Sequence, residues 1–323
     1  MHRDALHPTG PWRYLAARIA VAALGLLTAV SICFAAFRLG PLSTAQAIVG
    51  PVDLGPVRRQ RYHRLLGVDD DPVEAFLTYV DGPLTFDLGK AWVLDRGPAG
   101  PLLADALPNT ALVAVGAFCL VTVVAVPVGL AAGLRDGRLG AAVEYGSVLG
   151  RSSSNLVPAV LAVALLWPGG EPARPPVLVL TTVVVASTLV GTRIRAVSRA
   201  VREARHDGHV DAARAKGISR SAVFWRHLAP VALLTHLRRV ADDAAYLVGA
   251  VVVVEAVLPR ATPPVGEAYG LGRLFFQASI QGDFPLAATL VVLFTAAVLA
   301  VRLLGDLVLA LVDPRVGPRA GRR

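Results

Sequence analysis

The sequence has few charged and few aromatic residues, and these shortages limit what kind of protein it encodes. Only 17% of its 323 residues are charged and 6% are aromatic, whereas 54% are hydrophobic and the mean hydropathy is +0.58. A typical soluble domain has about 25% charged and roughly 45–50% apolar residues. The charges also cluster between long uncharged stretches. This pattern predicts a chain that is solvated by lipid along much of its length and by water elsewhere.

Cysteine and lysine are scarce as well. The two cysteines, Cys33 and Cys119, lie in apolar stretches and are too few for a disulfide framework or a metal cluster. We interpret them as small hydrophobic residues. Neither of the two lysines, Lys90 and Lys216, follows the glycine-rich pattern of a phosphate-binding P-loop. We therefore expect that this chain does not bind ATP by that route.

No arrangement of residues typical of catalysis is evident. The seven histidines are scattered, and His206 and His209, which would share one helix face, have no set of acidic partners for a metal. Ser152, Ser153 and Ser154 have no histidine base in the same segment. We expect no enzymatic activity, no metal and no cofactor in this chain.

Six apolar stretches are each long enough to cross a bilayer as a helix, which requires about 20 residues. The sequence therefore predicts an all-α polytopic transmembrane bundle of about six spanning helices, the first an uncleaved anchor. A long extracytoplasmic segment is expected after the first span. The predicted divisions are 1–38 (N-terminus and first helix), 39–106 (extracytoplasmic), 107–316 (five further helices) and 317–323 (tail). The six spans are 14–37, 107–134, 141–167, 176–197, 236–258 and 285–311.

The basic residues predict the orientation of the spans. With the N-terminus inside, nineteen Lys and Arg residues fall on the inner side and nine on the outer side. Cytoplasmic loops of membrane proteins are enriched in these residues. We therefore expect a cell-membrane protein with both termini in the cytoplasm. Since the positive charges lie between apolar spans, they do not indicate nucleic-acid binding.

Several polar features have two interpretations that the sequence leaves open. Ser152, Ser153, Ser154 and Asn155 in the third span fit either a translocation path or ordinary packing between helices. Arg302 has Asp306 one helical turn later as a partner, or extends to the membrane interface. The 39–106 segment, with a short helix predicted around 72–80, either has a functional role in docking another protein or in gating, or is a solvated lobe. Its acidic cluster comprises Asp69, Asp70, Asp71 and Glu74.

The most informative segment is the basic loop over 198–236. The fourth span is predicted to continue into the cytoplasm as an amphipathic helix, because Val197, Val201 and Ala204 recur at helical spacing. A short helix then covers 209–217 and ends at Gly217, which can adopt the left-handed conformation. Ser219 is the expected N-cap of a helix that ends before Pro230. A short alanine-faced helix suits insertion into a groove on another protein, although a plain surface loop explains the segment equally well.

This loop resembles the EAA loop of ABC importer permeases. The family pattern is Glu-Ala-Ala, three residues, Gly, nine residues, Ile, one residue, then Leu-Pro. Here Gly217 and Pro230 keep their places, but Asp211 replaces the glutamate before Ala212 and Ala213, and His227 and Ala229 stand where Ile and Leu are usual. The run from Ala212 through Arg214 and Lys216 to Gly217 is similar to the "TARAKG" version of dipeptide and oligopeptide permeases.

Other segments resemble the same subfamily and follow its order. The "LPNT" stretch ends at Thr110, "VVVE" ends at Glu255, and "GLG" covers residues 270–272. The closing "LVDPR" is similar to the family's "LLDPR". The chain departs from the family in its polar third span, in a longer stretch over 258–269, and at Arg302.

The resemblance implies the function and the partners. It implies a permease subunit that forms half of the translocation path of an ATP-binding cassette importer for peptides or a related solute. It implies a second permease subunit, two ATPase subunits that bind ATP, and an extracytoplasmic solute-binding protein. Related permeases handle dipeptides, oligopeptides, glutathione or nickel, and the residues do not select among them. An ion-coupled secondary transporter is the main alternative, and a membrane-embedded hydrolase is a weaker one. The ATPase-coupling residues implied by the resemblance are Asp211, Ala212, Ala213, Arg214, Lys216, Gly217 and Pro230.

Overall fold

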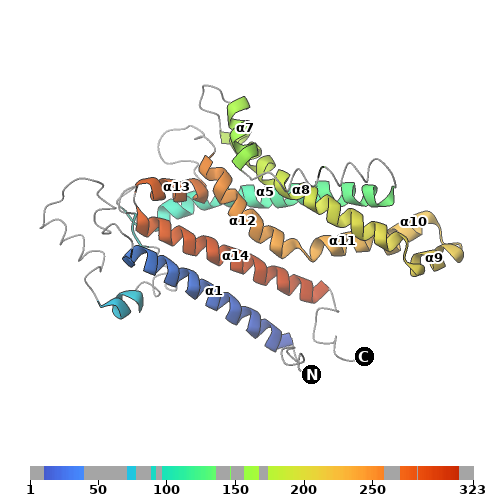
Figure 1. The fold of residues 1–323 in the computed structure, drawn as a ribbon, viewed down its shortest axis with the longest axis horizontal. Coiled ribbons are helices and arrows are strands. Elements are labelled where there is room, and N and C mark those ends of the chain that lie inside the picture. The colour runs from blue at the N-terminus through green and yellow to red at the C-terminus, as the bar shows by residue number, and fades with distance from the viewer. Residues whose placement is uncertain are drawn as a thin grey trace, which may run out of the picture. The chain divides into compact units, whose positions relative to one another are not determined.

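The computed structural model of the chain is helical throughout its described parts (Figure 1). It describes residues 11–39, 71–77, 89–91, 97–135, 146, 156–166, 174–257, 270–281 and 283–312. These residues confirm the all-α prediction, since they contain helices, turns and a single isolated β-bridge, between Lys90 and Pro98. The helices are α1 (Pro11–Leu39), α5 (Ala99–Leu134), α7 (Leu156–Leu166), α8 (Arg174–Arg205), α9 (Gly208–Ala215), α10 (Arg220–Val223), the π-helix η1 (Phe224–Leu228), α11 (Ala229–Leu237), α12 (Val240–Val257), α13 (Leu271–Gln281) and α14 (Phe284–Val312).

Four of the described helices are long and apolar enough to cross a membrane. These stretches are Ala16–Ala36, Ala99–Leu134, Val177–Arg205 and Pro285–Val308, and they correspond to four of the six predicted spans. The fifth prediction, 236–258, falls on α12, which has 18 residues and contains Asp242, Asp243 and Glu255. Of the third prediction, 141–167, the structure describes only Gly146 and α7, so most of it lies outside the described residues.

The long helices expose large apolar side chains along their outer faces. Val123 on α5 is 70% exposed and Leu165 on α7 is 76% exposed. In water such surfaces would be costly, because folding gains about 25 cal/mol of free energy for each square ångström of apolar surface that it buries, and exposed surface forgoes that gain. A hydrocarbon solvent removes that cost, so this exposure agrees with a membrane location.

The described chain forms two compact units. The first unit comprises the described residues within 1–110 and 265–323, and the second comprises those within 111–264. Helix α5 begins in the first unit and continues into the second.

In the first unit, α1 and α14 lie side by side (Figure 1). A Cβ atom added at Gly25 would lie 3.5 Å from the Leu299 side chain, so the two helices pack closely there. Asp306 of α14 contacts the guanidinium of Arg18 in α1, with 3.2 Å between Oδ2 and Nε. The sequence suggested only Arg302 as a partner for Asp306. Arg302 itself is exposed.

The start of α5 packs against α13 and α14 in the same unit. Their apolar cluster includes Ala99, Leu103, Leu271, Leu286 and Leu290, all nearly inaccessible to solvent. Helix α5 begins at Ala99, eight residues before the predicted span at 107. Burial of the turns before Pro108 keeps the helix continuous there, although proline removes one helical hydrogen bond. The helix predicted at 72–80 is confirmed over its described residues, 72–77, and begins after Asp71.

Two of the motif segments meet in this unit. The Thr110 hydroxyl accepts a hydrogen bond of 2.7 Å from the backbone N–H of Leu271, which is buried at the start of α13. The first N–H groups of a helix have no partner within the helix, so a side chain from another helix satisfies one here. Thr110 thereby attaches α13 to α5.

We expect Thr110→Val to lower the thermal unfolding midpoint of the purified protein in detergent. Valine keeps the shape of threonine but cannot accept the Leu271 hydrogen bond, and a buried donor left without a partner costs about 1–3 kcal/mol. Thr110→Ser keeps the hydroxyl and should unfold close to the wild type. Equal midpoints for Thr110→Val and Thr110→Ser would contradict this role.

Candidate functional site

The candidate site is the connecting segment, which we define as residues 206–237 between α8 and α12. Helix α8 continues to Arg205, well past its apolar part, as the spacing of Val197 and Val201 predicted. Both valines are fully buried. Helix α9 then begins after Asp207, whose backbone carbonyl accepts from the N–H of Val210 at 2.9 Å.

Helix α9 ends in a turn that depends on Gly217. This glycine has a φ of +76°, in the left-handed region. The N–H of Ile218 donates to the carbonyl of Ala213 at 3.2 Å. A left-handed glycine followed by this hydrogen bond is the Schellman arrangement, which satisfies a carbonyl that the helix end leaves unpaired. The predicted stop at Gly217 is confirmed.

Ser219 begins the next helix, as predicted. Its side-chain oxygen accepts from the N–H of Ala222 at 3.3 Å, which caps α10. The chain continues through η1 into α11, where Pro230 occupies the first turn. The predicted break at Pro230 is therefore a widened π-helical turn that precedes the proline. The wider turn accommodates a residue that has no N–H to donate and whose ring would clash with the carbonyl four residues earlier.

An apolar cluster attaches the connecting segment to the ends of α5 and α8. Val210 is fully buried, and Ala213, Val223 and Leu228 are between 2% and 7% exposed. Leu134, Ala204 and Ile218 pack against them. In addition, Nη1 of Arg205 donates to the carbonyl of Leu134 at 2.6 Å, at the C-terminal end of α5. Helix α9 is therefore held on the end of the helical bundle by packing and by a charged hydrogen bond.

The opposite face of α9 is exposed. Asp211, Ala212 and Ala215 of α9 are exposed, as is Lys216 directly after its last residue, and we call these four residues the outer face of α9. Two small residues therefore lie between an acidic and a basic side chain. Ala213, which the sequence grouped with Ala212, instead lies on the inner side of the helix. Ala215 was not among the predicted site residues, although a 3.6-residue period places it beside Ala212.

The remaining predicted site residues are distributed as follows. Gly217 and Pro230 are exposed. The structure describes the backbone of Arg214 but not its side chain. Ser152, Ser153, Ser154 and Asn155, the predicted path residues, lie outside the described residues.

The structure also reveals a buried polar group that the sequence did not predict. The Arg193 guanidinium of α8 forms an ion pair with the Asp243 carboxylate of α12, and both side chains are 6% exposed. On α11, His236 Nε2 lies 3.1 Å from the Thr122 hydroxyl of α5. The sequence assigned Arg193 to the positive-inside pattern and Asp243 to the end of a span. Opposite charges in neighbouring spans were the available signal, but their pairing depends on helix packing that the sequence does not specify.

Comparisons with known proteins identify the family of the chain. Residues 125–318 match the model of a family described as "Binding-protein-dependent transport system inner membrane component". A Brucella abortus (strain 2308) protein, named as a peptide transport system permease, is 28% identical over 93% of this chain and 97% of its own length. An oligopeptide transport system permease protein of Bacillus subtilis is 25% identical over 80% and 84% of the two chains. One from Salmonella typhimurium is 23% identical over 90% and 94%. These findings confirm the resemblance drawn from the motifs.

Proposed function

The chain belongs to the family of binding-protein-dependent transport system inner membrane components, and we propose that its connecting segment receives the work of ATP hydrolysis from separate subunits. Family membership makes the chain a multi-pass permease component of an ATP-binding cassette importer. It thereby favours the importer over the ion-coupled transporter that the sequence left as an alternative.

The observation that supports this site is the two-sided character of α9. Its inner side, Val210 and Ala213, is buried against the chain's own helices, whereas its outer face is exposed. Alanines on an exposed helix face allow another backbone to approach closely, and the flanking charges of Asp211 and Lys216 suit polar contacts at the rim of a groove. This combination suits a helix that inserts into a partner protein.

The way α9 is attached suits the transmission of force. A short helix that was free to rotate would absorb any displacement of its partner. Here the Gly217 turn, the apolar cluster and the Arg205 hydrogen bond hold α9 on the ends of α5 and α8. When an ATPase subunit moves, α9 would move these helices as rigid bodies and open the path to one side of the membrane or the other.

The proposal extends to the partners and the topology. The ATPases would bind α9 on the cytoplasmic side, with both termini of the chain in the cytoplasm. A second permease subunit would complete the path formed by residues 107–316, and a solute-binding protein would deliver the solute from outside. ATP would be bound by the partner subunits, since the chain has no P-loop pattern. Ser152, Ser153, Ser154 and Asn155 stay candidates for the lining of the path.

We further propose that the solute is a peptide. The support is that relatives which align over 80–94% of the chain are named as peptide, oligopeptide and dipeptide permeases. Nickel and glutathione are the competing solutes. Uptake of radiolabelled dipeptides, longer peptides, glutathione and nickel by the assembled transporter distinguishes them, and a transporter that accumulates only nickel would overturn the peptide assignment.

The docking role of α9 is tested by Ala212→Arg. Arginine is a good helix former, so α9 should keep its fold, but its long side chain would prevent close approach at the outer face. Disrupting a residue that contributes strongly to an interface lowers the binding free energy by at least about 2 kcal/mol, which is roughly thirtyfold in affinity. We expect the variant to lose ATPase subunits on co-purification and to lose ATP-dependent uptake.

Ser221→Arg is the matched control, because Ser221 is exposed on α10 and lies outside the outer face of α9. It should keep its ATPase subunits. If Ala212→Arg co-purifies with ATPases and transports as well as Ser221→Arg, α9 is not the docking element.

A further inference from the structure

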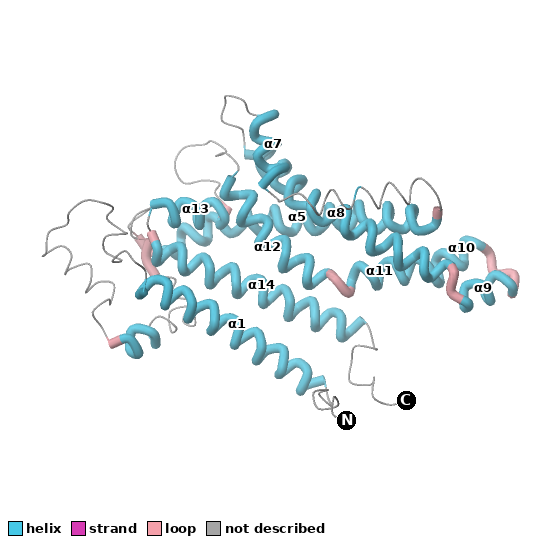
Figure 2. Tube along the Cα trace, viewed as in Figure 1, coloured by secondary structure: helices cyan, strands magenta, loops and turns pink. Residues whose placement is uncertain are grey.

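The junction between α11 and α12 is a break in an otherwise helical path. Helix α11 ends at Leu237, Arg238 and Arg239 form a turn, and α12 begins at Val240 (Figure 2). A second irregular point, η1, lies one helix earlier. Breaks and π-turns are the places where a helical path bends most easily. A displacement of α9 that travelled along the chain towards α12 would be absorbed at these two points.

Arg193 bridges this junction from α8. Its Nη2 donates to the Asp243 carboxylate in the first turn of α12 and lies 3.4 Å from the carbonyl of Arg239 in the turn. The same carbonyl accepts from the N–H of Asp243 at 2.9 Å, which is an early hydrogen bond of α12. One buried guanidinium therefore holds both sides of the break.

The junction is held on its other side by α5. Thr122 of α5 contacts His236 in the last turn of α11, and the Phe118 ring lies 6.3 Å from the His236 ring, centroid to centroid. Arg239 N–H donates in turn to the carbonyl of His236 at 3.1 Å. The turn is thus fixed relative to two neighbouring helices, and Arg193 supplies the charged contact.

Stability alone explains this pair poorly. In this part of the structure Nε of Arg193 and Oδ2 of Asp243 are buried without a hydrogen-bond partner. Burying two charges with incomplete hydrogen bonding is often no more stable than an apolar pair of similar volume. Such a pair is better explained by a geometry that it imposes.

The geometry links the docking site to a transport helix. Arg193 and Arg205 lie on one continuous helix, about 18 Å apart along its axis at 1.5 Å per residue. The Arg205 end packs with the connecting segment, and the Arg193 end is paired with α12. Helix α8 therefore connects the two directly and bypasses η1 and the 238–239 turn.

We propose that Arg193 is a positioning residue for transport, which clamps the α11–α12 junction to α8 so that a displacement of α9 moves α12 as well. This inference rests on the docking role of α9 proposed above. Without the clamp, the partner ATPases would still bind and hydrolyse ATP, but the turn at 238–239 would absorb the motion. The consequence is a loss of solute moved per ATP hydrolysed.

The test compares Arg193→Met/Asp243→Leu with the wild type in the complete transporter, reconstituted in vesicles with its ATPases, partner permease and binding protein. The double variant keeps the buried volume and leaves no unpaired charge. We expect normal co-purification with ATPases, ATP hydrolysis close to the wild type, and at least about fivefold less solute moved per ATP, the low end of typical coupling effects. Arg199→Met, on the exposed side of α8, should keep the wild-type ratio.

A second variant keeps the inference testable if the first does not fold. Arg193→Cys/Asp243→Cys, in a chain with Cys33→Ala and Cys119→Ala, is joined by a short bifunctional thiol reagent. The amount of solute moved per ATP hydrolysed should be low before cross-linking. It should recover after cross-linking, because the cross-link replaces the clamp. A role limited to folding would not be restored in this way.

Three results would overturn the clamp: a wild-type ratio in the Met/Leu variant, loss of ATPase binding in that variant, or a complete cross-link that restores no coupling. Whether α9 docks the ATPase is a separate question. That question is answered separately by Ala212→Arg, which abolishes ATPase binding if the proposed function holds.

Discussion

Adding a single methyl group at Gly129 or Gly133 of α5 is expected to destabilise the protein severely and to lower its folded yield. A Cβ atom at Gly129 would lie 2.7 Å from Cβ of Val197 and 2.9 Å from the carbonyl oxygen of Ile194. A Cβ atom at Gly133 would lie 2.7 Å from Cβ of Val201 and 2.8 Å from the carbonyl oxygen of Ser198. These glycines allow α5 and α8 to pack with their backbones nearly in contact.

The neighbours of the two glycines cannot move away easily. Val197 and Val201 are fully buried, and Leu130, Leu134 and Ala232 surround them. A β-branched side chain in a helix has essentially one side-chain rotamer available, and a backbone carbonyl moves only with its helix. Overpacking of this kind costs about 1–3 kcal/mol per site. In a membrane, where the hydrophobic effect does not drive helices together, close packing of small residues supplies much of the association energy.

The measurement is the yield of monodisperse protein after detergent extraction and size-exclusion chromatography, with the thermal unfolding midpoint. Glycine-to-alanine variants form a graded series. Gly249→Ala should fold like the wild type, because outside its own stretch of helix no described atom lies within 4 Å of its added Cβ. Gly116→Ala should be slightly destabilised, since its nearest neighbour is the Thr182 side chain at 3.2 Å. Gly129→Ala and Gly133→Ala should be severely destabilised.

Rescue identifies the contact that is responsible. Removing the two methyl groups of Val197 in Gly129→Ala/Val197→Ala should recover part of the folded yield. Equal yields for Gly129→Ala and Gly249→Ala would show that α5 and α8 do not pack as closely as the structure has them.

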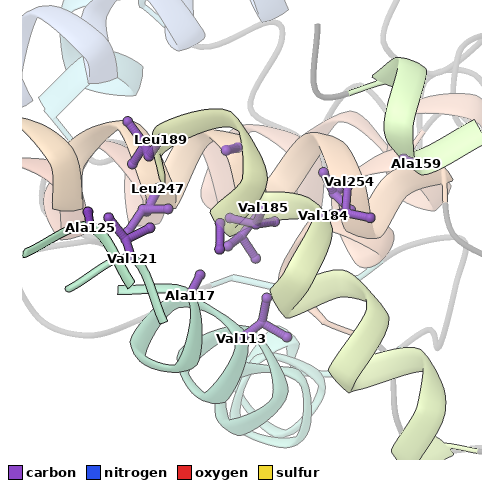
Figure 3. Close-up of a cluster of buried hydrophobic side chains, with 13 residues drawn as sticks. Val113, Ala117, Val121, Ala125, Ala159, Val184, Val185, Leu189, Leu247 and Val254 are labelled. Atoms are coloured by element: carbon purple, nitrogen blue, oxygen red, sulfur yellow. The ribbon is translucent and has the colours of Figure 1, made fainter. Parts of the chain in front are cut away.

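The close packing of α5 and α8 also explains how the second unit is built. Val113, Ala117 and Val121 of α5 face Val184, Val185 and Leu189 of α8, and α12 completes the cluster with Leu247 and Val254 (Figure 3). The small residues bring the helices together at one end, and this valine-rich cluster fills the space between them further along. Helix α8 is thereby fixed before it extends into the connecting segment.

Local features of this architecture were predictable from the sequence because they depend on nearby residues. The Gly217 turn and the Ser219 cap follow from the conformations and hydrogen bonds that these residue types favour at helix ends. The extension of α8 follows from the spacing of Val197 and Val201. The apolar length of a span is equally local, so four of the six predicted spans match long apolar helices in the described residues.

Features that depend on which helices become neighbours could not be predicted. Arg193 and Asp243 are 50 residues apart, and their opposite charges alone do not show that they pair. The close approach at Gly129 is another example, because glycine within a span is compatible with many packing partners. Ala213 is an intermediate case: its burial follows from the helical period only once the inner face of α9 is known. The start of α5 at Ala99 was missed because the turns before residue 107 are held in the helix by burial against α13 and α14, which the sequence does not specify.

The second large effect is expected at Gly217, where Gly217→Val should reduce ATP-driven uptake about tenfold while the protein still inserts and folds. An L-residue in the left-handed conformation costs about 1–2 kcal/mol, and the cost is greatest for β-branched residues. Apart from the two chain neighbours of Gly217, no atom that the structure describes lies within 4 Å of the added Cβ atom. The strain is therefore in the backbone alone, and relieving it means that φ becomes negative.

A negative φ at this position would alter the direction in which the chain leaves α9. Ile218 would then lose its hydrogen bond to the Ala213 carbonyl and its place in the apolar cluster that holds α9. Helix α9 would keep its outer face but lose its fixed orientation on α5 and α8. A strain of about 1.4 kcal/mol lowers the population of molecules with correctly oriented α9 about tenfold. If α9 docks the ATPase, as proposed, uptake falls by the same factor.

The measurement is uptake by the reconstituted transporter, with membrane insertion of each variant checked by its folded yield. Gly217→Asn is the informative control, because asparagine tolerates the left-handed conformation better than other residues with a Cβ atom. Uptake should decrease in the order glycine, asparagine, alanine, valine, which follows backbone strain rather than side-chain volume, since asparagine is larger than alanine. Uptake that instead follows side-chain volume would mean that the partner protein contacts position 217 directly and that the left-handed turn is not what matters there.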